Sequence, residues 1–299
     1  MNQTPQIDDP TTRPVAGASN ATTEQVPYPL AVARRGWWRG LLAILGVVVV
    51  MLVGQILTFL MLLLGQVYPE LNGGLVLGPI GILALNIGLI LLIPGSLLLS
   101  KLLYGSARDL LSVVGRLRWG LMARAALVVL PVWAVFIGAG LVLGVQPPSP
   151  IVIVIMVICI LTTPLQAAGE EMAFRGLLFR ATATWAPRGI GIVVGMVVSS
   201  VLFSIAHFVP NPWMASYYFI FGLSLAIIAW RTGGLEVPIL IHAVHNTFSF
   251  AVGLLTTGSV DALTQRNDID PGPAMLVYDA VFLGAAAVTW LVTRRKKTA

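Results

Sequence analysis

Eight long apolar segments constrain this chain more than any other feature of its sequence. A helix needs about 20 consecutive apolar residues to cross the roughly 30 Å hydrocarbon core of a bilayer. Only 10% of the 299 residues are charged, whereas soluble domains carry about a quarter. The sequence therefore predicts an all-α, multispanning membrane helical bundle with about eight transmembrane helices. The expected spans cover residues 41–66, 75–99, 121–145, 151–185, 189–209, 213–230, 234–256 and 274–293.

The fourth segment, residues 151–185, is too long for one straight crossing and contains Pro164. A proline inside a helix removes one backbone hydrogen bond and clashes with the preceding turn. A segment that is too long can also tilt in the bilayer. We therefore expect this span to break or to tilt strongly, with its crossing running from about Pro164 to Trp185.

Basic residues alternate between the two sides of the expected bundle. The connections near residues 67–74, 146–150 and 210–212 contain no Lys or Arg, and the connection 257–273 contains one, Arg266. The other connections and both ends of the chain are basic. This positive-inside pattern predicts an integral, multi-pass membrane protein with both termini in the cytoplasm. The net charge of +6 is then a topological signal, so we expect the lipid bilayer as a partner and no nucleic acid.

A few ionisable residues interrupt the apolar segments. A charged side chain at the centre of a membrane helix costs about 2.5–3.5 kcal/mol, so such groups usually face a polar cavity or a partner. The fourth segment contains Glu170, Glu171 and Arg175, and Glu171 can pair with Arg175 because the two are four residues apart. The three histidines of the chain lie in the fifth and seventh segments, at positions His207, His242 and His245.

Helical spacing assigns these groups to faces. Glu170 lies about 100° around the helix from its neighbour at position 171. His242 and Asn246 are four apart and share one face. We therefore expect three helices to direct Glu170, His207, His242 and Asn246 into a common pocket.

A carboxylate, two imidazoles and a carboxamide in one apolar pocket match peptide-bond hydrolysis by an activated water. A carboxylate in such a pocket can act as a general base, and a histidine beside it can orient the water and share the proton. A second histidine and an amide can donate hydrogen bonds to the oxyanion of the tetrahedral intermediate. No Gly-x-Ser-x-Gly accompanies these residues, and no His-Glu-x-x-His helix occurs.

A metal-dependent reaction is the alternative. Glu170, His207 and His242 could together bind one Zn²⁺, because three protein ligands and a water form a catalytic zinc site. The single cysteine, Cys159, excludes a metal cluster built on cysteines.

Three motifs follow one another on the apolar segments: Glu170-Glu171-x-x-x-Arg175, Phe203-x-x-x-His207 and His242-x-x-x-Asn246. With them, roughly residues 150–256 resemble the CPBP family, also called Abi, which comprises type II CAAX prenyl endopeptidases and bacteriocin-processing proteins. The resemblance implies an eight-helix intramembrane protease, either glutamate-dependent or a metallo-endopeptidase. It also implies a membrane-associated or lipidated protein or peptide as substrate, such as a prenylated CAAX protein that loses its C-terminal tripeptide.

The resemblance also implies a role for each of the six motif positions. These are the general base Glu170, the supporting ion pair Glu171 and Arg175, the water-positioning His207, and the oxyanion site His242 and Asn246.

Four regions follow along the chain. Residues 1–36 are polar, and we expect a disordered cytoplasmic N-terminal tail. We expect residues 37–149 to form three N-terminal transmembrane helices and residues 150–256 the CPBP-like catalytic core. Residues 257–299 are expected to hold the last transmembrane helix and a basic C-terminal tail.

Other functions are compatible with the same residues. The acidic cluster could be a structural ion pair, and His242 with Asn246 could join helices by hydrogen bonds. The polar groups could form the proton or ion path of a transporter or channel, which inverted repeats and broken helices would accompany. The chain could also be a non-enzymatic immunity or regulatory membrane protein that retains the pocket. His245 lies outside the motifs, and we expect it to be structural.

Overall fold

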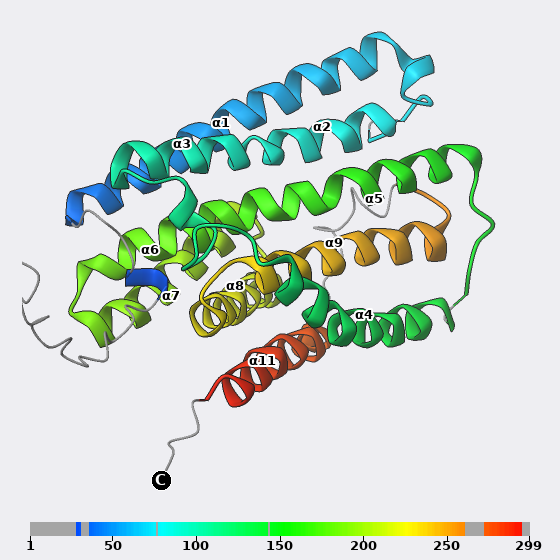
Figure 1. Cartoon of the computed structure of the whole chain (residues 1–299). Helices are drawn as coiled ribbons and strands as arrows, with labels where there is room; N and C mark the ends of the chain where they lie inside the picture. The colour runs from blue at the N-terminus through cyan, green and yellow to red at the C-terminus, as the bar shows by residue number, and fades with distance from the viewer. Residues whose placement is uncertain (1–27, 31–35, 76, 143, 261–271, 295–299) are drawn as a thin grey trace, which may run out of the picture.

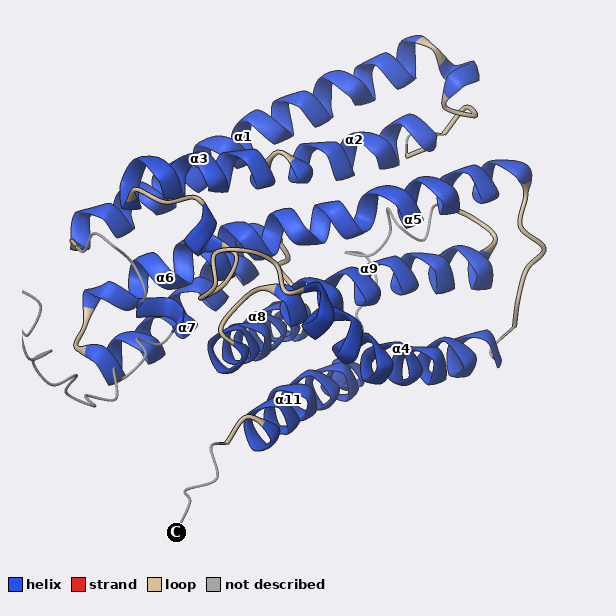
Figure 2. Cartoon of the chain, in the orientation of Figure 1, coloured by secondary structure: helices blue, strands red, loops and turns tan. Residues whose placement is uncertain are grey.

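The computed structural model describes residues 28–30, 36–75, 77–142, 144–260 and 272–294, and these residues are almost entirely helical. Figures 1 and 2 show long helices joined by short connections, with no strand in the described part. Eight helical segments in that part are long and apolar enough to cross a membrane, so the predicted all-α, eight-span bundle is confirmed. The main helices are α1 (Trp37–Val67), α2 (Pro79–Ile90), α3 (Leu92–Tyr104), α4 (Trp119–Val142), α5 (Pro150–Glu171), α6 (Phe179–Thr182), α7 (Arg188–Ala206), α8 (Pro212–Thr232), α9 (Glu236–Thr257) and α11 (Met275–Val292).

The fourth span runs over Pro150–Trp185, close to the expected residues 151–185. Of the two expectations for it, a break or a strong tilt, the break does not occur at Pro164, because α5 continues through the proline to Glu171. Neighbouring helices and side-chain hydroxyls can satisfy the backbone group that a proline frees in a membrane helix. The irregular part lies directly after Glu171, where Met172–Leu178 form a π-helical segment that leads into α6.

The centre of the bundle is formed by α5 and α9, which pack side by side (Figure 1). α2 packs on α5, α4 packs on α9, and α1 covers α2 and α3. α8 packs against both α7 and α11. In the apolar stretch that could span the membrane, 56% of the residues of α8 are buried but only 17% of those of α1. α8 is therefore an interior helix, whereas α1 is peripheral.

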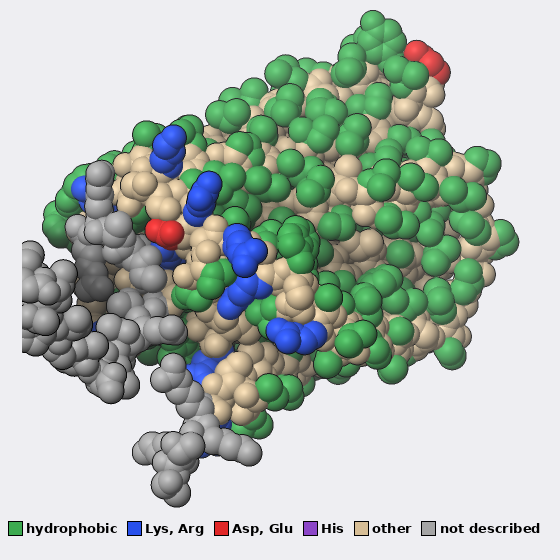
Figure 3. Space-filling model, in the orientation of Figure 1, with side chains coloured by type: hydrophobic (Ala, Val, Ile, Leu, Met, Phe, Trp, Pro, Cys, Tyr) green, Lys and Arg blue, Asp and Glu red, His purple; other side chains and the backbone are tan. Residues whose placement is uncertain are grey.

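The surface is divided between an apolar band and a basic end. Figure 3 shows Lys and Arg side chains gathered at the end of the molecule where α1 begins, while apolar side chains cover most of the remaining face. On α1, Leu52, Ile56 and Phe59 are each more than half exposed. Water disfavours an exposed apolar surface of this extent, whereas lipid acyl chains cover it. The protein is accordingly an integral membrane protein.

A short segment of the expected N-terminal tail is packed rather than disordered. Tyr28–Leu30 form a buried 3-10 helix. The Tyr28 hydroxyl donates a hydrogen bond of 2.5 Å to the carbonyl of Leu110, and its ring lies 5.4 Å from the Arg180 guanidinium. Burial raises the pKa of this hydroxyl, which keeps it a donor. The prediction of a disordered tail is therefore wrong for these three residues. Residues 1–27 and 31–35 lie outside the described part.

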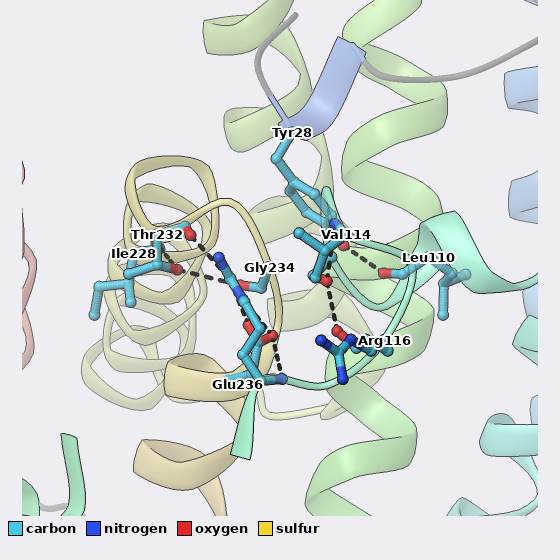
Figure 4. A network of polar contacts seen from close by, with 10 residues as sticks. Tyr28, Leu110, Val114, Arg116, Ile228, Thr232, Gly234 and Glu236 are labelled. Atoms are coloured by element: carbon cyan, nitrogen blue, oxygen red, sulfur yellow. Dashed lines mark hydrogen bonds and ion pairs between the residues drawn. The ribbon is translucent and has the colours of Figure 1, made fainter. Parts of the chain in front are cut away.

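α9 begins at a polar network supplied by the connection between α3 and α4 (Figure 4). The fully buried Glu236 accepts hydrogen bonds of 2.8–2.9 Å from the backbone N–H, Nε and Nη2 of Arg118. The Nη2 atom also donates to the carbonyl of Thr232 at 2.9 Å. The side-chain hydrogen bond to Glu236 raises the pKa of the Arg118 guanidinium. The network fixes the start of the helix that carries His242 and Asn246.

Close approach of α5 to the junction of α2 and α3 depends on Gly169. A Cβ atom at this position would lie 2.6 Å from the backbone oxygen of Leu89. Because the obstacle is backbone rather than a flexible side chain, it cannot rotate away. The contact sets how deeply α5 is seated directly beside Glu170.

We expect Gly169→Ala to lower the free energy of unfolding by about 1–3 kcal/mol, as overpacking does in protein cores. Thermal unfolding of the purified protein in detergent measures the change. Gly284→Ala in α11 is the matched control, because nothing lies within 4 Å of a Cβ atom there and alanine favours helices. Equal stability of the two variants would contradict the close approach.

Candidate active site

The last turns of α5 contain three buried polar residues, Gln166, Glu170 and Glu171. Gln166 and Glu170 are four apart, so they share one face of the helix, and both line an internal cavity. Glu171 does not line that cavity and is completely buried. The two adjacent carboxylates therefore lie in different surroundings.

Glu171 forms the ion pair that its spacing predicts. The Nη1 atom of Arg175 lies 3.0 Å from the Oε1 atom of Glu171, and both side chains are completely buried. The guanidinium also lies 4.1 Å from the ring centroid of Phe203 on α7. On α8, a Cβ atom at Gly222 would lie 3.2 Å from the Nη2 atom of Arg175, so the missing side chain leaves room for the guanidinium.

His242 on α9 faces both carboxylates of α5. Its Nδ1 atom lies 2.7 Å from the Oε1 atom of Glu171, and its Nε2 atom lies 3.3 Å from the Oε2 atom of Glu170. Glu171 is paired with Arg175 and accepts hydrogen bonds, so the Nδ1 atom of His242 must carry the hydrogen. The Nε2 atom of a neutral ring is then an acceptor that faces Glu170.

A carboxamide that the motifs do not contain joins two of the site residues. The Nε2 atom of Gln166 donates to the Oε1 atom of Glu170 at 2.8 Å. The Nδ2 atom of Asn246 donates to the Oε1 atom of Gln166 at 3.3 Å. Sequence reasoning missed Gln166, although its spacing of four residues from Glu170 was the available signal.

His207 follows the last residue of α7 and lies near the aromatic residues of α8. Its Nδ1 atom lies 2.8 Å from the carbonyl oxygen of Phe203, and because a carbonyl only accepts, Nδ1 carries the hydrogen. The ring stacks on Tyr218, with ring centroids 3.7 Å apart. Stacking and the hydrogen bond together fix the orientation of the imidazole.

Four of the six predicted site residues line one cavity of about 710 Å³: Glu170, His207, His242 and Asn246. The meeting of these side chains agrees with the common pocket expected from their spacing. Glu171 and Arg175 do not line the cavity and lie behind its wall. Aromatic and apolar side chains from α1, α2, α8 and α11 form much of the remaining lining.

His245 lines the same cavity but contacts different groups. The Tyr217 hydroxyl makes a short hydrogen bond with its Nε2 atom. The ring lies 4.8 Å from that of Trp133 and 5.1 Å from that of Phe282, measured between centroids. His245 is thus surrounded by aromatic side chains, whereas His242 faces the carboxylates.

The three residues expected to bind Zn²⁺ in the metal-dependent alternative, Glu170, His207 and His242, all line the cavity. Within the described part of the chain, no three His, Cys, Asp or Glu side chains are placed to hold a metal ion together. The Nδ1 atom of His242 lies against Glu171, and that of His207 against the carbonyl of Phe203. Histidines that bind zinc through Nε2 make the same Nδ1 contacts, so the ligand set Glu170, His207 and His242 stays a prediction.

Residues 148–248 match the family model of the type II CAAX prenyl endopeptidase Rce1-like family. The matched region contains all three motifs, and the match confirms the resemblance to the CPBP family. No curated protein and no solved structure matches the chain.

We expect Arg175→Met to lower the free energy of unfolding by about 3–5 kcal/mol, because it leaves the buried charge of Glu171 uncompensated. The double variant Glu171→Gln/Arg175→Met removes both charges and should recover most of this loss. Unfolding in detergent measures both variants. A double variant as unstable as the single one would show that lost packing, not the unpaired charge, causes the effect.

Proposed function

We propose that the protein is an intramembrane endopeptidase, on the premise that residues 148–248 match the model of the type II CAAX prenyl endopeptidase Rce1-like family. Its substrate is a membrane-associated or lipidated protein or peptide, of which a prenylated CAAX sequence is the first example to test. The proposal is supported above all by one observation: Glu170, His207, His242 and Asn246, from three separate helices, line the same cavity.

Glu170 activates the attacking water in the proposed reaction. Its Oε1 atom accepts a hydrogen bond from Gln166, whereas its buried Oε2 atom has no hydrogen-bond partner among the described residues, and the residue lines the cavity. A water held by Oε2 and by His207 can attack the carbonyl carbon of the scissile peptide bond while the carboxylate takes its proton. The new C–O bond turns the carbonyl into an oxyanion.

His242 and Asn246 stabilise that oxyanion. The proton taken by Glu170 can pass to the Nε2 atom of His242, 3.3 Å away. The resulting N–H then donates to the oxyanion beside the amide of Asn246, and Glu171 balances the imidazolium through Nδ1. When the C–N bond breaks, the same proton returns through Glu170 to the leaving amine, which restores the starting state.

The surface supports an orientation for this reaction. The apolar band is lipid-facing, and the basic end shown in Figure 3 belongs on the cytoplasmic side by the positive-inside rule. Both termini are proposed to lie on that side. The substrate approaches from the membrane, since its lipid or apolar part partitions there.

We expect Glu170→Gln and His207→Ala each to lower kcat by about a hundredfold or more, the usual contribution of a positioned general base and its partner. The measurement is cleavage of an internally quenched farnesylated peptide with a CAAX C-terminus by purified protein in liposomes. Glu70→Gln makes the same chemical change at an exposed site between α1 and α2 and should leave the rate unchanged. Equal rates in wild type and both site variants would end the catalytic assignment.

The proposed reaction uses no metal. Prolonged dialysis of the purified protein against a chelator should leave the cleavage rate unchanged. Loss of activity on dialysis and its recovery with Zn²⁺ would instead favour a zinc site on Glu170, His207 and His242.

A further inference from the structure

Gln166 is a buried carboxamide on α5 that bridges to α9. It is 5% exposed, lies one turn before Glu170 and lines the cavity. Its two polar atoms contact two different site residues, Glu170 at 2.8 Å and Asn246 at 3.3 Å. We propose that Gln166 is a positioning residue of the reaction, which fixes the reactive oxygen of Glu170 and the donor direction of Asn246. This inference rests on the proposed endopeptidase function.

The hydrogen bonds between Glu170 and Gln166 and between Gln166 and Asn246 determine how the two carboxamides are oriented. A carboxylate only accepts hydrogen bonds, so the atom of Gln166 next to Glu170 must be the NH₂ group. The oxygen of Gln166 then faces Asn246, which can meet it only with its own NH₂ group. The ionised base thereby sets the orientation of Gln166, and Gln166 sets that of Asn246.

This orientation selects one oxygen of the base. Gln166 occupies the Oε1 atom of Glu170, and the Oε2 atom has no hydrogen-bond partner among the described residues. Oε2 is also the oxygen that faces the Nε2 atom of His242 at 3.3 Å. A single oxygen therefore takes the proton of the water and relays it to His242.

The same orientation prepares the oxyanion donor. Asn246 spends one amide hydrogen on Gln166 and has a second one for a ligand. Asn246 follows His242 by one turn of α9, so the two donors share a face of the helix. If the carboxamide of Asn246 turned over, its oxygen would face the oxyanion and repel it.

Another buried carboxamide on the cavity wall shows what a structural role looks like. The Nδ2 atom of Asn86 on α2 donates to the hydroxyls of Thr162 and Thr163 on α5 at 2.6 and 3.3 Å. These bonds join two helices and include none of the proposed site residues. Gln166 differs because both of its partners are site residues.

The first test is a substitution that keeps shape and removes hydrogen bonding. Gln166→Met should lower kcat about a hundredfold, the loss expected when reacting groups are displaced by about 1 Å, with little change in KM. Gln166→Leu, which likewise cannot donate to Glu170, should lose as much. Thr162→Val removes one hydrogen bond between α5 and α2 and is the matched control, with activity expected to be unchanged. Normal kcat in Gln166→Met or in Gln166→Leu would overturn the proposal.

A double-mutant cycle separates positioning from general destabilisation. If Gln166 acts partly through Asn246, the variant Gln166→Met/Asn246→Leu should be little slower than Asn246→Leu alone. Two losses that multiply would show that the residues act independently and would overturn that part of the proposal.

A readout without substrate distinguishes failure of this inference from failure of the proposed function. The infrared difference spectrum between wild type and Glu170→Gln isolates the carboxylate band of Glu170. Gln166→Met should shift that band and Thr162→Val should not. If wild type cleaves the farnesylated peptide no faster than Glu170→Gln, the proposed function fails. The carboxylate band of Glu170 then still shows whether Gln166 is hydrogen-bonded to Glu170. An unshifted band would overturn the role of Gln166 whatever the activity.

Discussion

The carboxylate of Glu171 is completely buried in a membrane bundle, where a charge without a partner would cost several kcal/mol. Its Oε1 atom accepts hydrogen bonds from Arg175 and from His242. Arg175 in turn lies over Phe203 on α7. One buried charge thus connects α5, α7 and α9, the helices at which the four predicted site residues of the cavity lie. Compensation of Glu171 is therefore a contact that all three helices share.

The π-helical segment after Glu171 belongs to this same arrangement. Insertion of a wider turn changes which residues face the interior, and such turns often occur at functional sites. Here Met172–Leu178 are all buried, including the whole side chain of Arg175. α8 accommodates the guanidinium at Gly222, and α7 does so with the ring of Phe203. Residues of two neighbouring helices therefore leave room for, or pack against, the Arg175 guanidinium.

Hydropathy and spacing predicted the parts of this structure that depend on local sequence. Apolar length gave the eight spans, and a separation of four residues gave the contact between Glu171 and Arg175. Contacts between helices depend on how each helix is rotated and on rotamers, which one sequence does not encode in a readable pattern. For that reason the bridge through Gln166 and the position of His242 between two carboxylates were not foreseen.

The misjudged elements have a common physical cause, because tertiary surroundings overrode a local rule. Pro164 lies in a continuous helix, since neighbouring helices and side-chain hydroxyls in a bundle can satisfy the backbone group that the proline leaves without a hydrogen bond. Tyr28–Leu30 are packed because the Tyr28 hydroxyl can donate a hydrogen bond to the carbonyl of Leu110 and the Tyr28 ring lies beside the Arg180 guanidinium.

The network at the start of α9 has a mechanical consequence. Glu236 and His242 are six residues apart, about 9 Å along the helix axis. Arg118, which holds Glu236, belongs to a connection outside the apolar spans and is partly exposed. A helical segment this short is stiff, so the contact between Arg118 and Glu236 also helps to fix the position of the His242 ring at the cavity.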